Sequence, residues 1–125
     1  MVLTGFYAGV LALIYVVLTF NVIGRRMRYK AGRGDAGHED LARAVRVHGN
    51  FIEYTPIALI LIGVLDSQGL APAWIHAMGL TFVAARILHI YAITKGNIGI
   101  RKTGMVMTVG VIALAAILCI MRFVL

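Results

Sequence analysis

Polar residues that could do chemistry interrupt an apolar segment in the stretch RVHGNFIEYTP, at residues 46–56. A helix turns by about 100° per residue, so Arg46, Asn50 and Glu53 fall within one narrow face, bordered by Tyr54. From Arg46 to Glu53 the helix rises by about 10 Å, roughly the length of a small extended peptide. A stripe of both charge signs inside an apolar segment is costly unless it has a partner.

Two later segments carry residues that could complete such a site. The segment AARILHIYA places Arg86 and His89 three residues apart on a common helix face, and Arg101 opens the last apolar segment. Arginines then outnumber the one nearby acid, Glu53, and surplus buried positive charge favours an anionic ligand. The alternative is a structural ion pair in which Glu53 satisfies Arg46 or Arg86.

The elements that must position these residues are membrane-spanning helices. The chain has 125 residues, of which 61% are hydrophobic and 14% charged, with a mean hydropathy of +0.91. Lipid offers no partner for unpaired backbone groups, and the apolar runs are too long for barrel strands. The sequence therefore predicts an all-α integral membrane four-helix bundle, a single domain over residues 1–125. The four expected spans, each near the 20 residues that cross a bilayer, are residues 2–23, 45–65, 72–93 and 104–124.

The net charge of +7 is distributed unevenly between the loops. The second loop, DSQGLAP, has no lysine or arginine, which by the positive-inside rule places the first and third loops in the cytoplasm and both termini outside. The basic excess is then a topology signal with some affinity for anionic lipid headgroups, and nucleic-acid binding is not expected. The basic residues of the first and third loops are Arg25, Arg26, Arg28, Lys30, Arg33, Arg43, Lys95, Arg101 and Lys102.

Local signals indicate how the helices begin, end and pack. Glycines and mixed charges predict a turn after Tyr29 and a short amphipathic lead-in from His38 into the second helix. The short second loop makes the second and third helices antiparallel neighbours. Gly79, Gly104 and Gly110 are expected to allow close approach of helices.

Two residues stand apart from the polar face. His48 points about 200° away from Arg46, so we expect it to face something other than the ligand of its own subunit. The single cysteine, Cys119, cannot form an intrachain disulfide or a multi-cysteine metal site. We therefore expect Cys119 to serve packing and predict no metal.

The stretch RVHGNFIEYTP resembles the second-helix signature of the MAPEG family, the membrane-associated proteins of eicosanoid and glutathione metabolism. The likeness continues in ARILH of the third helix and in RKTGM at the opening of the fourth. It covers nearly the whole chain and is closest to the small bacterial inner-membrane branch. The resemblance implies a homotrimer of four-helix subunits that holds glutathione, as a substrate, between neighbouring subunits.

The resemblance also implies roles for individual residues. Glu53 would face the amino group of glutathione, Arg46 a carboxylate, and Arg101 would act as the catalytic residue by stabilising the thiolate. His48 would contribute to the adjacent subunit's site or line the trimer axis, or else be a hydrogen-bonded interface histidine. The further binding positions that the resemblance implies are Asn50, Tyr54, Arg86 and His89, with Arg25 and Arg26 matching after a one-residue gap.

The resemblance is not complete in the third helix. Well-studied eukaryotic members place tyrosine hydroxyls one and two turns after the arginine, where this sequence has His89 and Ile93, with Tyr91 displaced around the helix. The expected function is a glutathione-dependent transferase or peroxidase acting on lipophilic electrophiles. The alternative is a non-catalytic binding or scaffold protein of the same fold. A small multidrug exporter is a weaker alternative, because the first span lacks the carboxylate on which those transporters depend.

Overall fold

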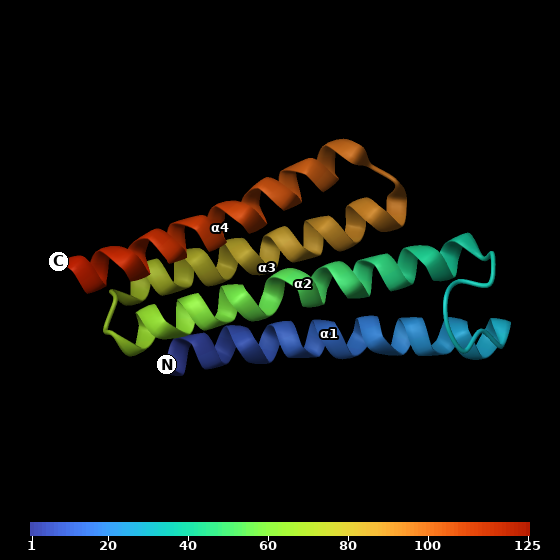
Figure 1. Ribbon diagram of the computed structural model, residues 1–125, viewed down its shortest axis with the longest axis horizontal. Coiled ribbons are helices and arrows are strands. Elements are labelled where there is room, and N and C mark those ends of the chain that lie inside the picture. The colour runs from blue at the N-terminus through green and yellow to red at the C-terminus, as the bar shows by residue number, and fades with distance from the viewer.

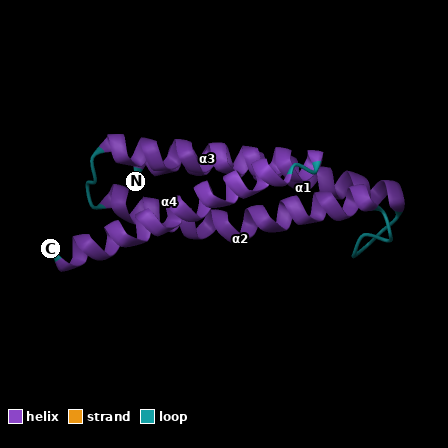
Figure 2. Ribbon diagram, turned by 90° about the horizontal axis from the view of Figure 1, so that it is seen from above, coloured by secondary structure: helices purple, strands orange, loops and turns teal.

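The computed structural model describes residues 1–125 and consists of four antiparallel α-helices joined by short connections, with no strand (Figures 1 and 2). All four helices are long and apolar enough to cross a membrane, which confirms the predicted all-α membrane bundle. In chain order the helices are α1 (Val2–Tyr29), α2 (Glu39–Ser67), α3 (Pro72–Lys95) and α4 (Ile98–Val124).

The helices extend beyond the expected spans at the end of the bundle that carries the first and third loops. As predicted, α1 ends at Tyr29, where Lys30 adopts a left-handed conformation with φ 51°, and His38 is the N-cap of α2. Arg101 was expected to open the fourth helix and Gly104 its apolar span, whereas α4 begins at Ile98, three residues before Arg101. There the side chain of Asn97 accepts a hydrogen bond from the backbone N–H of Ile100 at 3.0 Å, which satisfies one of the unpaired donors of the first turn.

The helix α2 and the helix α3 form the centre of the bundle. The helix α1 contacts both of them on one side and α4 contacts both on the other, whereas α1 and α4 do not touch. The two termini and the α2–α3 connection lie at one end of the bundle, and the α1–α2 and α3–α4 connections lie at the other (Figure 1). The helix ends and connections that hold most of the arginines and lysines therefore share one end of the bundle.

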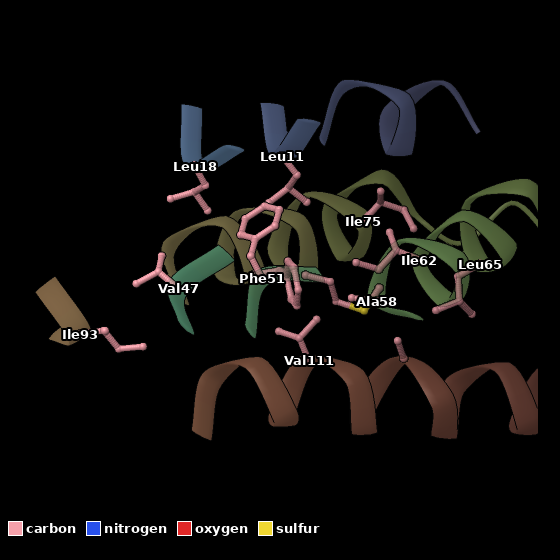
Figure 3. Packing of buried hydrophobic residues seen from close by; sticks show 13 residues of the cluster. Leu11, Leu18, Val47, Phe51, Ala58, Ile62, Leu65, Ile75, Ile93 and Val111 are labelled. Carbon is pink, nitrogen blue, oxygen red and sulfur yellow. The ribbon is translucent and has the colours of Figure 1, made fainter. Parts of the chain in front are cut away.

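Buried apolar side chains from all four helices fill the space between them. Leu11 of α1 and Val111 of α4 point toward α2, where Phe51 and Ile62 lie in the same cluster (Figure 3). Lipid tails are as apolar as leucine, so helices in a bilayer associate through close packing and polar contacts rather than through a hydrophobic driving force.

Two glycines allow unusually close helix contacts. A Cβ atom built on Gly79 would lie 2.6 Å from the ring of Tyr7 on α1. A Cβ atom on Gly104 would lie 3.1 Å from the carbonyl oxygen of Ala85 and 3.2 Å from the backbone nitrogen of His89, both on α3. Gly110 was also expected to allow close helix packing, but within this chain no atom lies within 4 Å of a Cβ atom built on it.

Polar contacts close the end of the bundle that carries the termini. The carboxylate of Asp66 accepts hydrogen bonds from both the backbone N–H and the hydroxyl of Thr4, each at 2.9 Å. Because these bonds reach the unpaired first turn of α1, Asp66 acts as a cap supplied by another helix. Farther along α4, the half-buried Cys119 thiol lies 3.7 Å from the carbonyl oxygen of Leu61, a packing position as expected.

Candidate functional site

A recess of about 230 Å³ opens at the end of the bundle that carries the basic connections, where α2, the end of α3 and the first turn of α4 meet. Arg46 of α2 and Arg101 of α4 both line it, although 55 positions separate them in the sequence. We call this hollow the Arg46–Arg101 recess. The rest of its lining is Glu39, Arg43, Ala92, Ile93, Gly96, Asn97 and Ile98.

The Arg46–Arg101 recess carries uncompensated positive charge. Arg43 forms an ion pair with Glu39 one turn away on α2, so these two charges cancel. Arg46 and Arg101 are exposed and take part in none of the chain's ion pairs. The first turn of α4 contains no acidic residue, so the partial positive charge of its N-terminus adds to theirs. The recess is therefore suited to an anion.

A second polar cluster is buried between α2 and α3, around Arg86, whose side chain is only 1% exposed. Its Nη1 donates hydrogen bonds to the side-chain oxygen of Asn50 at 2.9 Å and to the Asn50 carbonyl at 3.3 Å. The guanidinium carbon also lies 5.6 Å from the centre of the Tyr54 ring. The Nε and Nη2 atoms are buried without a partner, and no carboxylate pairs with this charge. Two unused donors on a buried guanidinium are costly, and Arg86 itself does not line the Arg46–Arg101 recess.

Glu53 does not join this cluster. Its side chain is exposed on α2 and forms no ion pair, so the structural pairing of Glu53 with Arg46 or Arg86 is absent from the chain. Its neighbours Ile52 and Ile57 are exposed as well. An ionised carboxylate facing lipid inside a membrane-spanning helix is expensive, which makes this surface of α2 unsuited to contact with lipid.

Helix α3 also carries a buried histidine, between the cluster around Arg86 and the Arg46–Arg101 recess. His89, 2% exposed, lies one turn after Arg86, and the backbone of α4 approaches it closely at Gly104. One turn farther, Ile93 lines the Arg46–Arg101 recess. Tyr91 is half-exposed on another face of α3, as the sequence indicated, so its hydroxyl does not line the recess.

Arg25 and Arg26 lie outside the Arg46–Arg101 recess and are used to close the first loop. Arg25 forms a 2.7 Å ion pair with Asp40, and the hydroxyl of Tyr29 donates to the same carboxylate oxygen at 2.8 Å. Arg26 donates to the carbonyl oxygen of Gly34 at 2.8 Å. In this chain their donors hold the end of α1 against the loop and the start of α2.

His48 packs against α1 of its own chain. Its Nε2 lies 3.1 Å from the hydroxyl of Thr19, and its ring stacks on Tyr15 with the centroids 5.1 Å apart. The Thr19 hydroxyl donates its only hydrogen to the Tyr15 carbonyl at 2.9 Å, so the His48 Nε2 must be the donor to Thr19. Within one subunit His48 therefore packs on α1, which the periodicity of α2 could not indicate. Its expected contribution to an adjacent subunit's site remains a prediction.

Comparison with known proteins identifies the family. The model of the MAPEG family matches residues 4–121, nearly the whole chain. The chain belongs to the MAPEG family. It is also similar to the inner membrane protein YecN of two Escherichia coli strains, each 34% identical over 99 residues, which is 79% of this chain and 76% of the relative.

In this MAPEG chain, sequence reasoning overlooked two residues that shape the site. Glu39 neutralises Arg43, and Asn97 caps the turn that carries Arg101. Both had recognisable signals. The four-residue spacing of Glu39 and Arg43 is that of a helical ion pair, and an asparagine directly after a glycine is typical of a helix start.

Proposed function

We propose that this MAPEG protein is a glutathione-dependent transferase or peroxidase that acts on lipophilic electrophiles and holds glutathione as its thiolate. The observation that carries the proposal is the convergence of Arg46 and Arg101, two guanidinium groups without ion pairs, on one recess at the end of a membrane bundle. Glutathione bears two carboxylates and a thiol, and all three become anions that arginine binds well.

Arg101 would supply the chemistry at the thiol. An ordinary cysteine thiol has a pKa of about 8.5, so only a few per cent is thiolate at neutral pH, yet the thiolate is the nucleophile. Lowering that pKa by two units takes about 2.7 kcal/mol. A charge-assisted hydrogen bond from a guanidinium contributes about 1.5–3 kcal/mol, so one arginine in a partly desolvated recess is sufficient.

The thiolate would then react in one of two ways. In conjugation, its sulfur forms a bond to an electrophilic carbon, and the leaving group departs with the electron pair of the broken bond. In peroxide reduction, the sulfur attacks the terminal oxygen, the O–O bond breaks, and the alkoxide takes up a proton. A second glutathione thiol converts the sulfenic acid to the disulfide and releases water. Arg101 lowers the pKa that limits both routes.

Arg46, Asn50 and Arg86 would bind the rest of the tripeptide, and Glu53 its ammonium group. Arg86 supports this assignment with two unpartnered buried nitrogens, and Glu53 with an unpaired carboxylate on α2. The exposure of Glu53 among isoleucines also favours a second copy of the chain over lipid on this face, in line with the homotrimer that the family resemblance implies.

The basic end of the bundle would face the cytoplasm, with both termini outside. The first and third connections share one end (Figure 1), and most of the chain's lysines and arginines lie in them or in the adjoining helix ends. Cytoplasmic loops are enriched in these residues, and the similar YecN is named an inner membrane protein. We therefore place the chain in the bacterial inner membrane, with its recess within reach of cytoplasmic glutathione.

A second candidate is a binding or scaffold protein of the same fold that performs no chemistry. The observation that favours it is Ile93, which lines the recess at a position where the family resemblance implies a tyrosine hydroxyl. With isoleucine at this position, the glutathione sulfur has one hydrogen-bond donor fewer than it would have with tyrosine.

The deciding experiment measures thiolate formation directly. Glutathione is added to the purified protein in detergent micelles, and the ultraviolet absorbance of the thiolate is followed alongside calorimetric binding. We expect saturable binding with a matching rise in absorbance, and conjugation of a generic aromatic electrophile. S-methylglutathione is the control, since it should bind without the absorbance. Binding without thiolate would identify the scaffold, and no binding at all would refute the proposed transferase or peroxidase.

A further inference from the structure

The Arg46–Arg101 recess contains a third arginine, Arg43, which is held by an acidic partner of the same helix. Arg43 lines the recess together with Arg46 and Arg101, and no lysine lines it. Arg43 lies three residues before Arg46 on α2, so the two are neighbours on the helix surface, separated by a rise of about 4.5 Å. The lining therefore presents three guanidinium groups, of which only that of Arg43 has an ion-pair partner.

The ion pair of Arg43 with Glu39 is of a kind that exchanges readily. It joins one oxygen of Glu39 to one nitrogen of Arg43, and the two side chains are 77% and 44% exposed. Exposed pairs between residues four apart on a helix contribute little stability, because water screens both charges. Once released, Glu39 would still lie in the first turn of α2, where the helix N-terminus favours a negative charge. Replacing Glu39 by another carboxylate therefore costs little.

The order of charged residues along α2 indicates which carboxylate would replace that of Glu39. Glutathione as a thiolate carries three anionic groups, and the proposed function assigns Arg101 to the sulfur and Arg46 to a carboxylate. Glu53, assigned to the ammonium group, lies seven residues after Arg46, and Arg43 lies on the other side of Arg46. The ammonium group belongs to the γ-glutamyl end of the tripeptide. A ligand laid along α2 in this order therefore places its glycyl carboxylate at the Arg43 end.

We infer that Arg43 binds the glycyl carboxylate of glutathione and releases Glu39 as it does so, a role that rests on the proposed function. Glu39 also lines the recess, so its carboxylate would repel the incoming carboxylate if it stayed in place. A thiol that brings no carboxylate to this end of the recess, such as cysteine, leaves the pair intact and gains nothing from Arg43. The pair of Glu39 and Arg43 therefore selects the tripeptide over smaller thiols.

The test compares glutathione with two of its monoamides of equal net charge, by calorimetry of the full chain in detergent micelles. One carries the amide on the glycyl carboxyl group and the other on the glutamyl α-carboxyl group. Arg43→Gln should lower the affinity for glutathione and for the glutamyl amide about three- to tenfold, a loss limited by the partial exposure of Arg43. The affinity for the glycyl amide should not change. Arg28→Gln is the matched control, since Arg28 lies at the same end, outside the recess and without an ion pair, and should alter none of the three affinities.

Replacing Glu39 tests the exchange itself. Glu39→Gln leaves no carboxylate to displace, so glutathione affinity should rise about two- to threefold, while that of the glycyl amide stays the same. Arg43→Lys keeps the charge and should recover part of the affinity lost in Arg43→Gln. If Arg43→Gln fails to fold, the result for Glu39→Gln decides alone. Equal losses of both amides in Arg43→Gln would indicate a general charge effect and overturn the role, as would an unchanged glutathione affinity in both Arg43→Gln and Glu39→Gln. A wild-type protein that does not bind glutathione would overturn the proposed function, and this role with it.

Discussion

At the end of the bundle that carries the termini, polar side chains are satisfied within the chain. Asp66 accepts two hydrogen bonds from Thr4, and the Tyr7 hydroxyl lies 2.7 Å from Nδ1 of His76. At the opposite end, Arg46 and Arg101 form no ion pair, although both line one recess. Two positive charges that line one recess repel each other unless an anion lies between them. The contrast therefore separates a closed end that contributes stability from an open end prepared for a ligand.

The strongest way to break this comparison is to remove the arginine at the open end. Arg101→Ala should lower conjugation about 10- to 150-fold, the loss of a charge-assisted hydrogen bond of about 1.5–3 kcal/mol, while glutathione affinity changes little. Steady-state kinetics and calorimetry measure the two quantities. Arg122→Ala is the matched control, since Arg122 lies at the other end and donates to the carbonyl oxygen of Gln68 at 2.7 Å. Unchanged turnover in Arg101→Ala would remove it from the mechanism.

A smaller effect is expected from replacing Gly104, the glycine at which α4 packs closely against α3 near the open end. Gly104→Ala introduces a Cβ atom 3.1 Å from the carbonyl oxygen of Ala85 and 3.2 Å from the backbone nitrogen of His89. Backbone atoms cannot rotate away, so α4 must shift, at a cost of about 1–3 kcal/mol. We expect lower thermal stability and slower conjugation, because Arg101 lies one turn away on α4. Gly110→Ala, in open space, should change neither; a loss there would show that another copy packs against Gly110.

Replacing Glu53 tests whether its unpaired carboxylate binds the ammonium group of glutathione. Glu53→Gln keeps the shape of the side chain but removes its charge, so glutathione affinity should fall by about 1–3 kcal/mol. Calorimetry measures this change, and a glutathione analogue without the amino group supplies the control. The analogue should bind the variant and the wild type equally. If the variant binds glutathione as tightly as the wild type does, Glu53 does not face the ammonium group.

The smallest change is expected at the closed end. Thr4→Val keeps the shape of a 4% exposed residue but removes the hydroxyl that donates to Asp66. The free energy of unfolding should fall by about 1.5 kcal/mol, the low end of the range for a hydrogen bond to a charged group, because the Thr4 backbone N–H still binds the same carboxylate. Denaturant titration in micelles measures it, with glutathione binding and turnover expected to stay at the wild-type level. A change in turnover larger than the change in stability would contradict the division between the two ends.

Most of the fold could be predicted because the length of each apolar segment can be read directly from the sequence. The turn after Tyr29 and the start of α2 beyond His38 were predicted correctly from glycines and charges. The start of α4 at Ile98 was not predicted, because spans were counted from apolar residues. A helix continues into water wherever its first turn is capped, and Asn97 supplies that cap.

The candidate site could be predicted only as a set of residues on one helix face. Arg46, Asn50 and Glu53 do share a side of α2, but the structure divides them. Arg46 lines the recess, Asn50 binds Arg86, and Glu53 remains exposed. This face of α2 is about 60° wide, so residues at its two edges contact different neighbouring helices. The periodicity of one helix does not show where those neighbouring helices lie.

The sequence by itself determined the membrane class, the four helices, the shared end of the basic loops and the surplus of arginine, since these follow from length, polarity and spacing along one chain. Only the tertiary structure decided that Arg46 and Arg101 meet, that Arg86 keeps two unpartnered nitrogens, and that His48 turns to α1. Those outcomes depend on which helices pack together and at what register. Contacts such as the close approach at Gly104 set that register, and they join residues distant in the sequence.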